Sequence, residues 1–179
     1  MAKPRGFTVL ELVIVVAVLG IVAAITIPAL VRSRVAANES ATIGDLRTLH
    51  DAQEAYRSVN GGLYDSNLDC LLSPSTGCIP SYPSSAPTFL DSQLASTVSK
   101  SGYNRLFAGG PPPANLPPTV SQTSTDRYRY DTTPVVVGVT GVRGFATDAS
   151  GRICFTFDGM PIPAGVPTQT LPLNCRDLR

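Results

Sequence analysis

The chain of 179 residues carries 14 Lys and Arg against 13 Asp and Glu, so its formal net charge at pH 7 is +1. A charge this close to zero gives no electrostatic case for nucleic acid as the main partner, although a role in DNA uptake stays open. The length suits one membrane anchor and one modest domain. Two local basic clusters, Arg32 with Arg34 and Arg127 with Arg129, fit lipid headgroup contacts and ordinary strand surface.

The first informative feature is an apolar run from Leu12 to Val31 that contains no charge. Its twenty residues are enough for a helix to cross the hydrocarbon layer of a membrane. Directly before the run, Glu11 places a carboxylate in apolar sequence. A charge at the bilayer centre costs roughly 2.5–3.5 kcal/mol, so we expect Glu11 to have a function and a partner. A secretory signal peptide would end in a small-residue cleavage site, but here the small residue, Gly6, precedes the run.

These residues resemble the amino terminus of the type IV prepilins, a family that includes the pseudopilins of type II secretion. The resemblance rests on a basic leader over residues 1–6, Gly6 before the cut, Phe7 as the first mature residue, Glu11 as the fifth, and Pro28 inside the helix. It implies that a prepilin peptidase cleaves after Gly6 and N-methylates Phe7. It also implies that the mature subunits assemble into a helical filament.

Physical chemistry gives a reason for the charged positions. Cleavage after Gly6 would create a free α-amine on Phe7, four residues before the Glu11 carboxylate. The amine of an incoming subunit can pair with Glu11 of the preceding subunit, which removes two unpaired charges from lipid and sets the axial register. The alternative is an ordinary single-span anchor with an incidental Glu11.

Two further residues of the run, Gly20 and Pro28, are expected to matter for assembly. Glycine is a poor helix former and proline lacks the amide hydrogen of the helix ladder, so the stretch between them is locally weak. One expectation is a bend or partial melting on assembly. The other is a harmless kink, which membrane helices tolerate because neighbouring groups satisfy the backbone.

Apolar residues recur every three or four positions within residues 32–60, which predicts an amphipathic half of the same helix. The members of this stripe are Leu46, Leu49, Ala52, Tyr56 and Val59. No helix breaker occurs before Gly61-Gly62. The sequence therefore predicts one helix from about Phe7 to the end of the stripe, near 80 Å long at about 1.5 Å per residue. Residues 7–31 would lie in the membrane or the filament core.

Residues 61–179 are expected to form a globular, β-rich head with Pro-rich loops. Proline, serine and glycine between residues 63 and 118 predict loop and linker, with one short helix at Thr88–Ser99. The predicted strands are 127–131, 134–140, 143–148 and 152–157, with a turn at 148–151 and an irregular tail at 159–179. The predicted fold class is α+β, a ladle in which the long helix packs against an antiparallel sheet of roughly three to five strands, similar to pilins.

All four cysteines, Cys70, Cys78, Cys154 and Cys175, follow the apolar run. An even number of cysteines suits disulfides in an oxidising compartment, so we expect a single-pass protein of the inner membrane with a periplasmic head. Of three possible pairings, Cys70 with Cys78 and Cys154 with Cys175 are favoured, because each closes a loop rich in Pro, Gly or Ser. The second pair also resembles the carboxy-terminal disulfide loop of many pilins. Zinc is the rival interpretation, but the chain has no Cys-x-x-Cys.

The sequence contains no recognisable catalytic constellation. Its one histidine, His50, lies in the predicted helix without a visible orienting group, so a packing or surface role is favoured. No phosphate-binding loop, dinucleotide fingerprint or His-Glu metal motif is present. We therefore predict no enzyme activity, no catalytic residue, no cofactor and no metal, with calcium at Asp148 and Asp158 as a weak alternative.

The resemblance implies a structural subunit, a major or minor pilin of a type IV pilus. Its implied partners are identical or related pilin subunits, the prepilin peptidase and the inner membrane before assembly, and it reaches the cell surface in the filament. The extended head with two expected disulfides favours this role over that of a type II secretion pseudopilin, which is the first alternative. An alternative of another class is a membrane-tethered module that binds DNA, glycan or protein.

Overall fold

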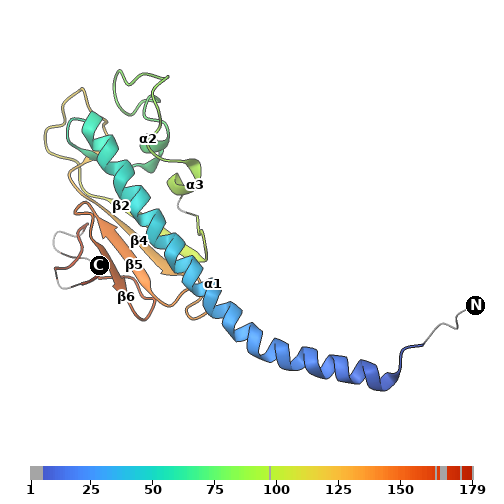
Figure 1. Ribbon diagram of the computed structural model, residues 1–179. Coiled ribbons are helices and arrows are strands. Elements are labelled where there is room, and N and C mark those ends of the chain that lie inside the picture. Colours follow the sequence, from blue (N-terminus) through green and yellow to red (C-terminus); the bar gives the residue numbers. More distant parts are fainter. Residues whose placement is uncertain (1–5, 97, 164, 166–168, 174, 179) are drawn as a thin grey trace, which may run out of the picture.

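The computed structural model describes residues 6–96, 98–163, 165, 169–173 and 175–178. One long helix, α1 (Val9–Val59), projects from a head in which strands and loops pack on the second half of the helix (Figure 1). The long helix followed by antiparallel sheets confirms the predicted α+β class. Residues 1–5 of the predicted leader lie outside the described residues.

Helix α1 begins at Val9, two residues beyond the predicted start at Phe7. The cause is an N-cap at Thr8, whose backbone is extended and whose Oγ1 accepts a hydrogen bond from the Glu11 amide at 3.2 Å. Such a cap satisfies one of the amide donors that a helix leaves free at its first turn.

The helix ends at Val59, the residue at which the sequence predicts its end. The amide of the C-cap residue Asn60 donates to the carbonyl of Tyr56, and the chain then turns through two glycines with positive φ, Gly61 at 62° and Gly62 at 86°. A Cβ on Gly61 would also lie 2.7 Å from the Val120 side chain, so the turn has no room for a side chain at this position.

Between these ends the helix is continuous across Gly20 and Pro28, and Figure 1 shows that its first half curves away from the direction of the second. Pro28 removes one amide donor, and Thr26 nearby donates its hydroxyl to the Val22 carbonyl at 2.8 Å, a contact that often accompanies bent helices. The single chain thus has a bent, continuous helix. Melting on assembly stays a prediction.

The two halves of α1 differ in burial. Residues 6–34 are exposed along their whole length, and the first buried residue of the helix is Glu39. The buried residues of α1 are Glu39, Thr42, Leu46, Leu49, Ala52, Gln53 and Tyr56. Val59, which the sequence places on the same stripe, is 47% exposed. The head therefore packs only on the second half of the helix.

The main sheet is fully antiparallel, with the strand order β2-β4-β5-β6-β7. Its strands are β2 (Tyr103–Gly109), β4 (Tyr128–Pro134), β5 (Gly144–Asp148), β6 (Ile153–Thr156) and β7 (Arg176–Asp177). A second, two-stranded sheet pairs β1 (Tyr64–Asp65) with β3 (Ser124–Thr125), and the head also holds the short helices α2 (Leu68–Leu72) and α3 (Ser92–Ala95). Five strands in the main sheet fall at the upper limit of the prediction.

The strand predicted at residues 134–140 is wrong. The chain leaves β4 at Pro134 and folds back on itself, with Gly138 at a φ of 82°. The Gly138 amide donates to the Gly141 carbonyl at 2.8 Å, and the Thr140 amide donates to the Val136 carbonyl at 2.9 Å. Successive valines favour a strand, but the glycines and these local hydrogen bonds stabilise a turn instead.

The region predicted as loop and linker contains a strand that the sequence did not predict, β2, which pairs with β4 along its whole length. The helix predicted at Thr88–Ser99 is limited to α3. It begins only after Asp91, because the Asp91 side chain caps it by accepting from the Leu94 amide at 2.8 Å. Just upstream, the Phe89 amide donates to the Leu71 carbonyl instead. The tail predicted as irregular also adds a short edge strand, β7.

The core between α1 and the main sheet is rich in aromatic side chains. Those that are buried are Tyr56, Tyr64, Tyr103, Tyr128, Tyr130 and Phe145. A buried polar group fixes β1 to the helix: the Gln53 amide and the Asp65 backbone exchange hydrogen bonds at 3.0 and 3.1 Å, and the Tyr56 hydroxyl donates to the Asp65 carboxylate at 2.8 Å. Burial and the nearby Asp65 carboxylate raise the pKa of Tyr56, so it remains a donor.

The structure bonds Cys70 to Cys78 and Cys154 to Cys175, the pairing that the sequence favours among three. The first bond ties α2 to the following Pro-rich loop. The second joins β6 to the chain just before β7, so the tail is fastened to the main sheet.

Candidate functional site

The predicted cleavage point lies in non-helical backbone ahead of α1. Gly6 and Phe7 both precede the N-cap, and Phe7 exposes 68% of its surface. A Cβ built on Gly6 would have no neighbour within 4 Å. The peptide bond between Gly6 and Phe7 is therefore accessible in the single chain, as a peptidase substrate must be.

Glu11 lies in the first turn of α1, where a carboxylate interacts favourably with the positive end of the helix dipole. Its amide bonds to Thr8, but its carboxylate has no hydrogen bond or ion pair with any residue that the structure describes. The neighbours in sequence, Leu10 and Leu12, are 70% and 54% exposed apolar side chains. Among the described residues, the Glu11 carboxylate is thus an unpaired anion on an apolar helix surface.

Among the residues described, α1 is the one helix long and apolar enough to cross a membrane, judged by length and composition. None of its most apolar window is buried against the head. Gly20 lies within this window, and a Cβ there would meet nothing within 4 Å, so no contact inside the chain requires its lack of a side chain.

The junction between helix and head is held by Glu39, which is not among the functional residues predicted from the sequence. Both carboxylate oxygens are used: Oε2 accepts from the Arg143 guanidinium at 2.6 and 2.8 Å, and Oε1 accepts from the amides of Val142 and Arg143 at 2.9 and 3.1 Å. Burial acts to raise the pKa of Glu39, but these hydrogen bonds outweigh it and hold the pKa below its usual range.

A sequence signal for this junction exists. Glu39 lies three residues before Thr42 and seven before Leu46, so a carboxylate continues the buried stripe toward the membrane half. A charge on an apolar helix face has to be paired to be buried. One residue earlier, the Asn38 side chain donates to the Thr140 carbonyl at 2.8 Å and strengthens the same junction.

The predicted weak candidates for catalysis and metal binding have structural roles. His50 packs against Gly151 and its Nδ1 lies 2.9 Å from the Tyr128 hydroxyl. Asp148 accepts from the Leu171 amide at 2.7 Å, and Asp158 accepts from the Met160 amide at 3.1 Å. Asp148 and Asp158 do not form a group of metal-ligating atoms with other described residues.

The one group of such atoms in the described part of the chain is formed by Cys154, Cys175 and Asp177. Its two sulfurs are joined in a disulfide, and zinc or another soft metal needs thiolates. The group is therefore part of the tail attachment.

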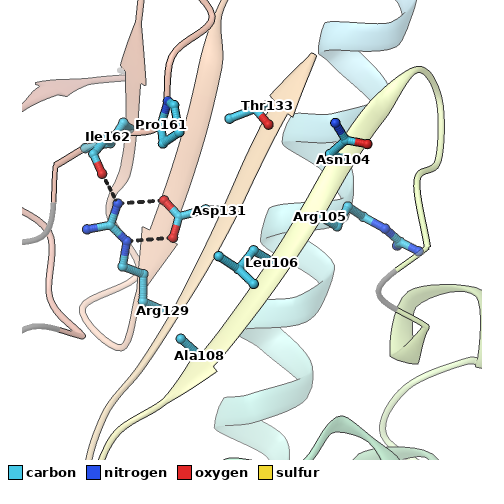
Figure 2. A pocket seen from close by; sticks show the side chains of 9 residues that line it. All are labelled: Asn104, Arg105, Leu106, Ala108, Arg129, Asp131, Thr133, Pro161 and Ile162. Atoms are coloured by element: carbon cyan, nitrogen blue, oxygen red, sulfur yellow. Dashed lines mark hydrogen bonds and ion pairs between the residues drawn. The ribbon is translucent and has the colours of Figure 1, made fainter. Parts of the chain in front are cut away.

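A hollow of about 340 Å³ lies on the face of the sheet away from α1, between β2, β4 and the tail (Figure 2). Two of its three charged members, Arg129 and Asp131, are joined by two hydrogen bonds at 2.6 and 2.7 Å. The third, Arg105, donates to the carbonyls of Gln93, Ser96 and Val98. The Arg129 guanidinium also donates to the carbonyls of Ile162, Pro163 and Thr170. Because these groups are bound to each other and to the backbone, the hollow offers a binding surface without an activated nucleophile or base.

The expectation that Arg129 belongs to ordinary strand surface is therefore wrong, since it is only 4% exposed. The alternation of β4 places Arg129 and Asp131 on the same face, where the tail covers them. Its neighbour Arg127 is partly exposed and pairs with Asp126, in line with the expectation.

Residues 1–27 match the family model described as the prokaryotic N-terminal methylation motif. The chain is 41% identical over 56 residues to the type IV major pilin protein PilA of Myxococcus xanthus, covering 31% of this chain and 26% of that protein. It is 37% identical over 73 residues to the type IV wide pilus major component PilA4 of Thermus thermophilus, covering 41% and 55%. It is 28% identical over 111 residues to the type II secretion system core protein G of Escherichia coli, covering 61% and 67%. No solved structure matches the chain.

The methylation motif on a long apolar helix that continues into a β-rich head defines a class of protein, the pilin-like subunits. The chain is similar to type IV pilins and to type II secretion pseudopilins, and residues 1–27 carry the methylation motif. The chain spans about a quarter and about half of the length of the two pilins it matches.

Proposed function

We propose that this chain is a structural subunit of a type IV pilus, a major or minor pilin. A prepilin peptidase cuts it after Gly6 and methylates the new amino terminus at Phe7. The mature subunit then joins identical or related subunits in a helical filament. The observation that carries the proposal is the methylation motif over residues 1–27, placed on a helix half that the head leaves uncovered.

The exposed half of α1 supports assembly through the helices. Burying apolar surface contributes about 25 cal/mol per Å², and none of residues 6–34 is buried within the chain. Lipid covers this surface before assembly, and the helices of neighbouring subunits cover it in the filament. Gly20, with open space around it, allows another helix to approach closely at that point.

The unpaired Glu11 supports a specific register for this assembly. In the proposed filament, the Glu11 carboxylate of one subunit pairs with the free amine on Phe7 of the next. Leaving the anion unpaired in the apolar bundle would be costly, so neighbouring helices are favoured in the one offset that brings amine and carboxylate together.

The proposal assigns each part of the chain a role. Residues 1–6 are the leader, residues 7–31 the span and filament core, residues 32–60 the helical support of the head, and residues 61–179 the head. The two disulfides support a periplasmic head on a single-pass anchor in the inner membrane, because disulfides persist in oxidising compartments. In the filament the same head would be displayed at the cell surface. No catalytic step is part of this function.

A type II secretion pseudopilin is the second candidate. The observation in its favour is that the match to core protein G of Escherichia coli extends over 61% of this chain, further than either pilin match. Both candidates use the same processing and the same helix packing. Isolation of the assembled filament with its secretion or pilus machinery distinguishes them.

The test of processing is mass spectrometry of the full chain after co-expression with a prepilin peptidase. We expect a mature protein that begins with N-methylated Phe7, and a Gly6→Val variant that keeps its leader. Normal cleavage of the Gly6→Val variant would contradict the assignment.

The test of assembly uses the same system with the Glu11→Val variant. We expect normal cleavage and loss of incorporation into filaments, because the incoming amine then has no partner. Asp51→Val is the matched control, since it removes an exposed carboxylate from the head half of α1. Full incorporation of Glu11→Val would reject the register argument and favour a simple membrane tether.

A further inference from the structure

The connection between β4 and β5 is an apolar surface that the head does not bury. We call residues 135–142 the valine loop. It contains no charged residue. Its five valines are each partly or largely exposed: Val135 48%, Val136 49%, Val137 53%, Val139 58% and Val142 41%. A contiguous exposed apolar surface of this kind marks a site of interaction with another molecule or a membrane.

The valine loop lies beside α1 where the helix leaves the head (Figure 1). Asn38 and Glu39 bind it to the helix through the Thr140 carbonyl and the Val142 amide. Gly138 and Val142 also share the wall of a hollow of about 460 Å³ with Val31, the last residue of the apolar run. The loop therefore reaches the level at which the predicted span ends.

Most backbone amides of the valine loop already have hydrogen-bond partners. The amides of Gly138, Val139 and Thr140 bond to carbonyls within the loop, at 2.8 to 3.1 Å. The Val136 amide bonds to the Thr140 hydroxyl at 3.0 Å, and the Val135 amide bonds to a carbonyl outside the loop. Paired amides lower the cost of moving non-helical backbone into an apolar layer.

We propose that, before assembly, the valine loop inserts its side chains into the membrane surface at the boundary of headgroups and acyl chains. The inference rests on the membrane anchoring that is part of the proposed function. Asn38 lies seven residues beyond Val31, about 10 Å along the helix axis. The headgroup layer of one leaflet is roughly 5–8 Å thick, so a loop that extends from Asn38 back to Val31 spans it.

The charges around the loop fit the same position. Arg32 and Arg34 follow the span at once and are exposed, so their side chains can reach lipid phosphates. The cation that directly follows the loop, Arg143, is held by Glu39 and carries no unpaired charge toward the loop. Phe157 and Met160, 59% and 58% exposed, add apolar surface to the same side of the head: Phe157 lines the hollow with Val31, and the Met160 carbonyl contacts Gly144.

The valine loop lies next to the end of the membrane span, so a bilayer is favoured over a protein as the partner of the loop. Every stored subunit carries its valine loop at the end of the membrane helix, so lipid is within reach whenever the helix is inserted. In this position the loop fixes the tilt of the head against the membrane and keeps its apolar side chains from water.

The chain contains no tryptophan, so one introduced tryptophan reports its own surroundings without background. The experiment places the full chain in vesicles of phosphatidylcholine and phosphatidylglycerol. The phosphatidylcholine carries bromine on its acyl chains, at carbons near the headgroup. Val137→Trp and Val139→Trp report on the loop. Val16→Trp reports on the span. Val59→Trp is the matched control, because Val59 is a similarly exposed valine about 42 Å beyond Val31 along the helix.

We expect the two loop reporters to show blue-shifted emission and loss of fluorescence in brominated vesicles, as Val16→Trp does, while Val59→Trp is unaffected. If Val16→Trp is quenched but both loop reporters behave like Val59→Trp, the inference alone is wrong and the loop faces water or a protein neighbour. If Val16→Trp is not quenched, membrane anchoring fails, and the inference fails with it.

Discussion

Glu39 on α1 and Arg143, directly before β5, form a doubly hydrogen-bonded ion pair across 104 residues of sequence. The Glu39 side chain is 8% exposed and that of Arg143 is 30% exposed. Glu39 is also the first buried residue of the helix, so this pair marks the point at which the uncovered half of α1 becomes part of the head. The geometry suits a role in positioning the head on the helix.

Replacing Glu39 with Gln should lower the free energy of unfolding of the head by about 2–3 kcal/mol. Removal of one partner from a buried pair costs about 3–5 kcal/mol, and the partial exposure of Arg143 reduces this loss. Urea denaturation of the full chain in detergent, followed by the fluorescence of the core tyrosines, measures the change. Asp126→Asn breaks an exposed pair and should cost less than about 1 kcal/mol. Equal effects of the two variants would contradict a special role for Glu39.

The same residue predicts a loss of stability in acid. Because the pKa of Glu39 is lowered in the folded chain, its stabilising contribution is fully present above the ordinary glutamate value of about 4.3 and is lost as the pH falls through the lowered value. As the pH is lowered below about 4, we expect the urea concentration at the unfolding midpoint to decrease more steeply for the wild type than for Glu39→Gln. Parallel pH profiles would show that Glu39 is not the titrating group.

Arg129 should hold the tail on the outer face of the sheet. Arg129→Lys keeps the charge but cannot bind Asp131 with two parallel hydrogen bonds and reach the tail carbonyls at once, so we expect a loss of about 2–4 kcal/mol. Hydrogen exchange should become faster at Ile162 and Leu171. Arg127→Lys, two residues away in a more exposed pair, is the matched control and should have little effect. Unchanged exchange in Arg129→Lys would refute this role.

The two disulfides should contribute unequally. Loop closure over a sequence separation of 21 residues, between Cys154 and Cys175, predicts roughly 3.3 kcal/mol, and closure over 8 residues, between Cys70 and Cys78, predicts roughly 2.5 kcal/mol. Each pair is replaced by serines, and the unfolding free energies are compared by urea denaturation. A larger loss from the shorter loop would mean that packing around α2, and not chain entropy, dominates.

Local sequence signals sufficed for α1. An apolar run, a regular stripe and Gly61-Gly62 predict its length to within two residues, because each acts within a few positions of the chain. The remaining discrepancy at the start comes from the Thr8 hydroxyl, whose single hydrogen bond makes Thr8 the N-cap and leaves Phe7 outside the helix. The disulfide pairing is also local, since each bond closes a loop that the composition marks as irregular.

Other features depend on partners that are distant in sequence. β2 lies next to a run of glycine and proline that favours loop, and it becomes a strand because β4 offers it a complete row of hydrogen bonds. The valines after Pro134 favour a strand by composition, yet that segment has no strand partner beside it and turns at Gly138 instead. The partners of Glu39 and Arg129 are likewise settled by tertiary contacts. The helix stripe indicates that Glu39 is buried, but it does not identify Arg143 as the partner.

The continuity of α1 has a mechanical consequence. No hinge or linker separates the part of the helix that anchors the subunit from the part that carries Leu46, Leu49 and Tyr56 into the aromatic core. Tension applied along a filament of such subunits would pass directly into the interior of each head. The head could be torn from its helix only by pulling those side chains out of the sheet, so resistance to stretching and the folding of the head depend on the same contacts.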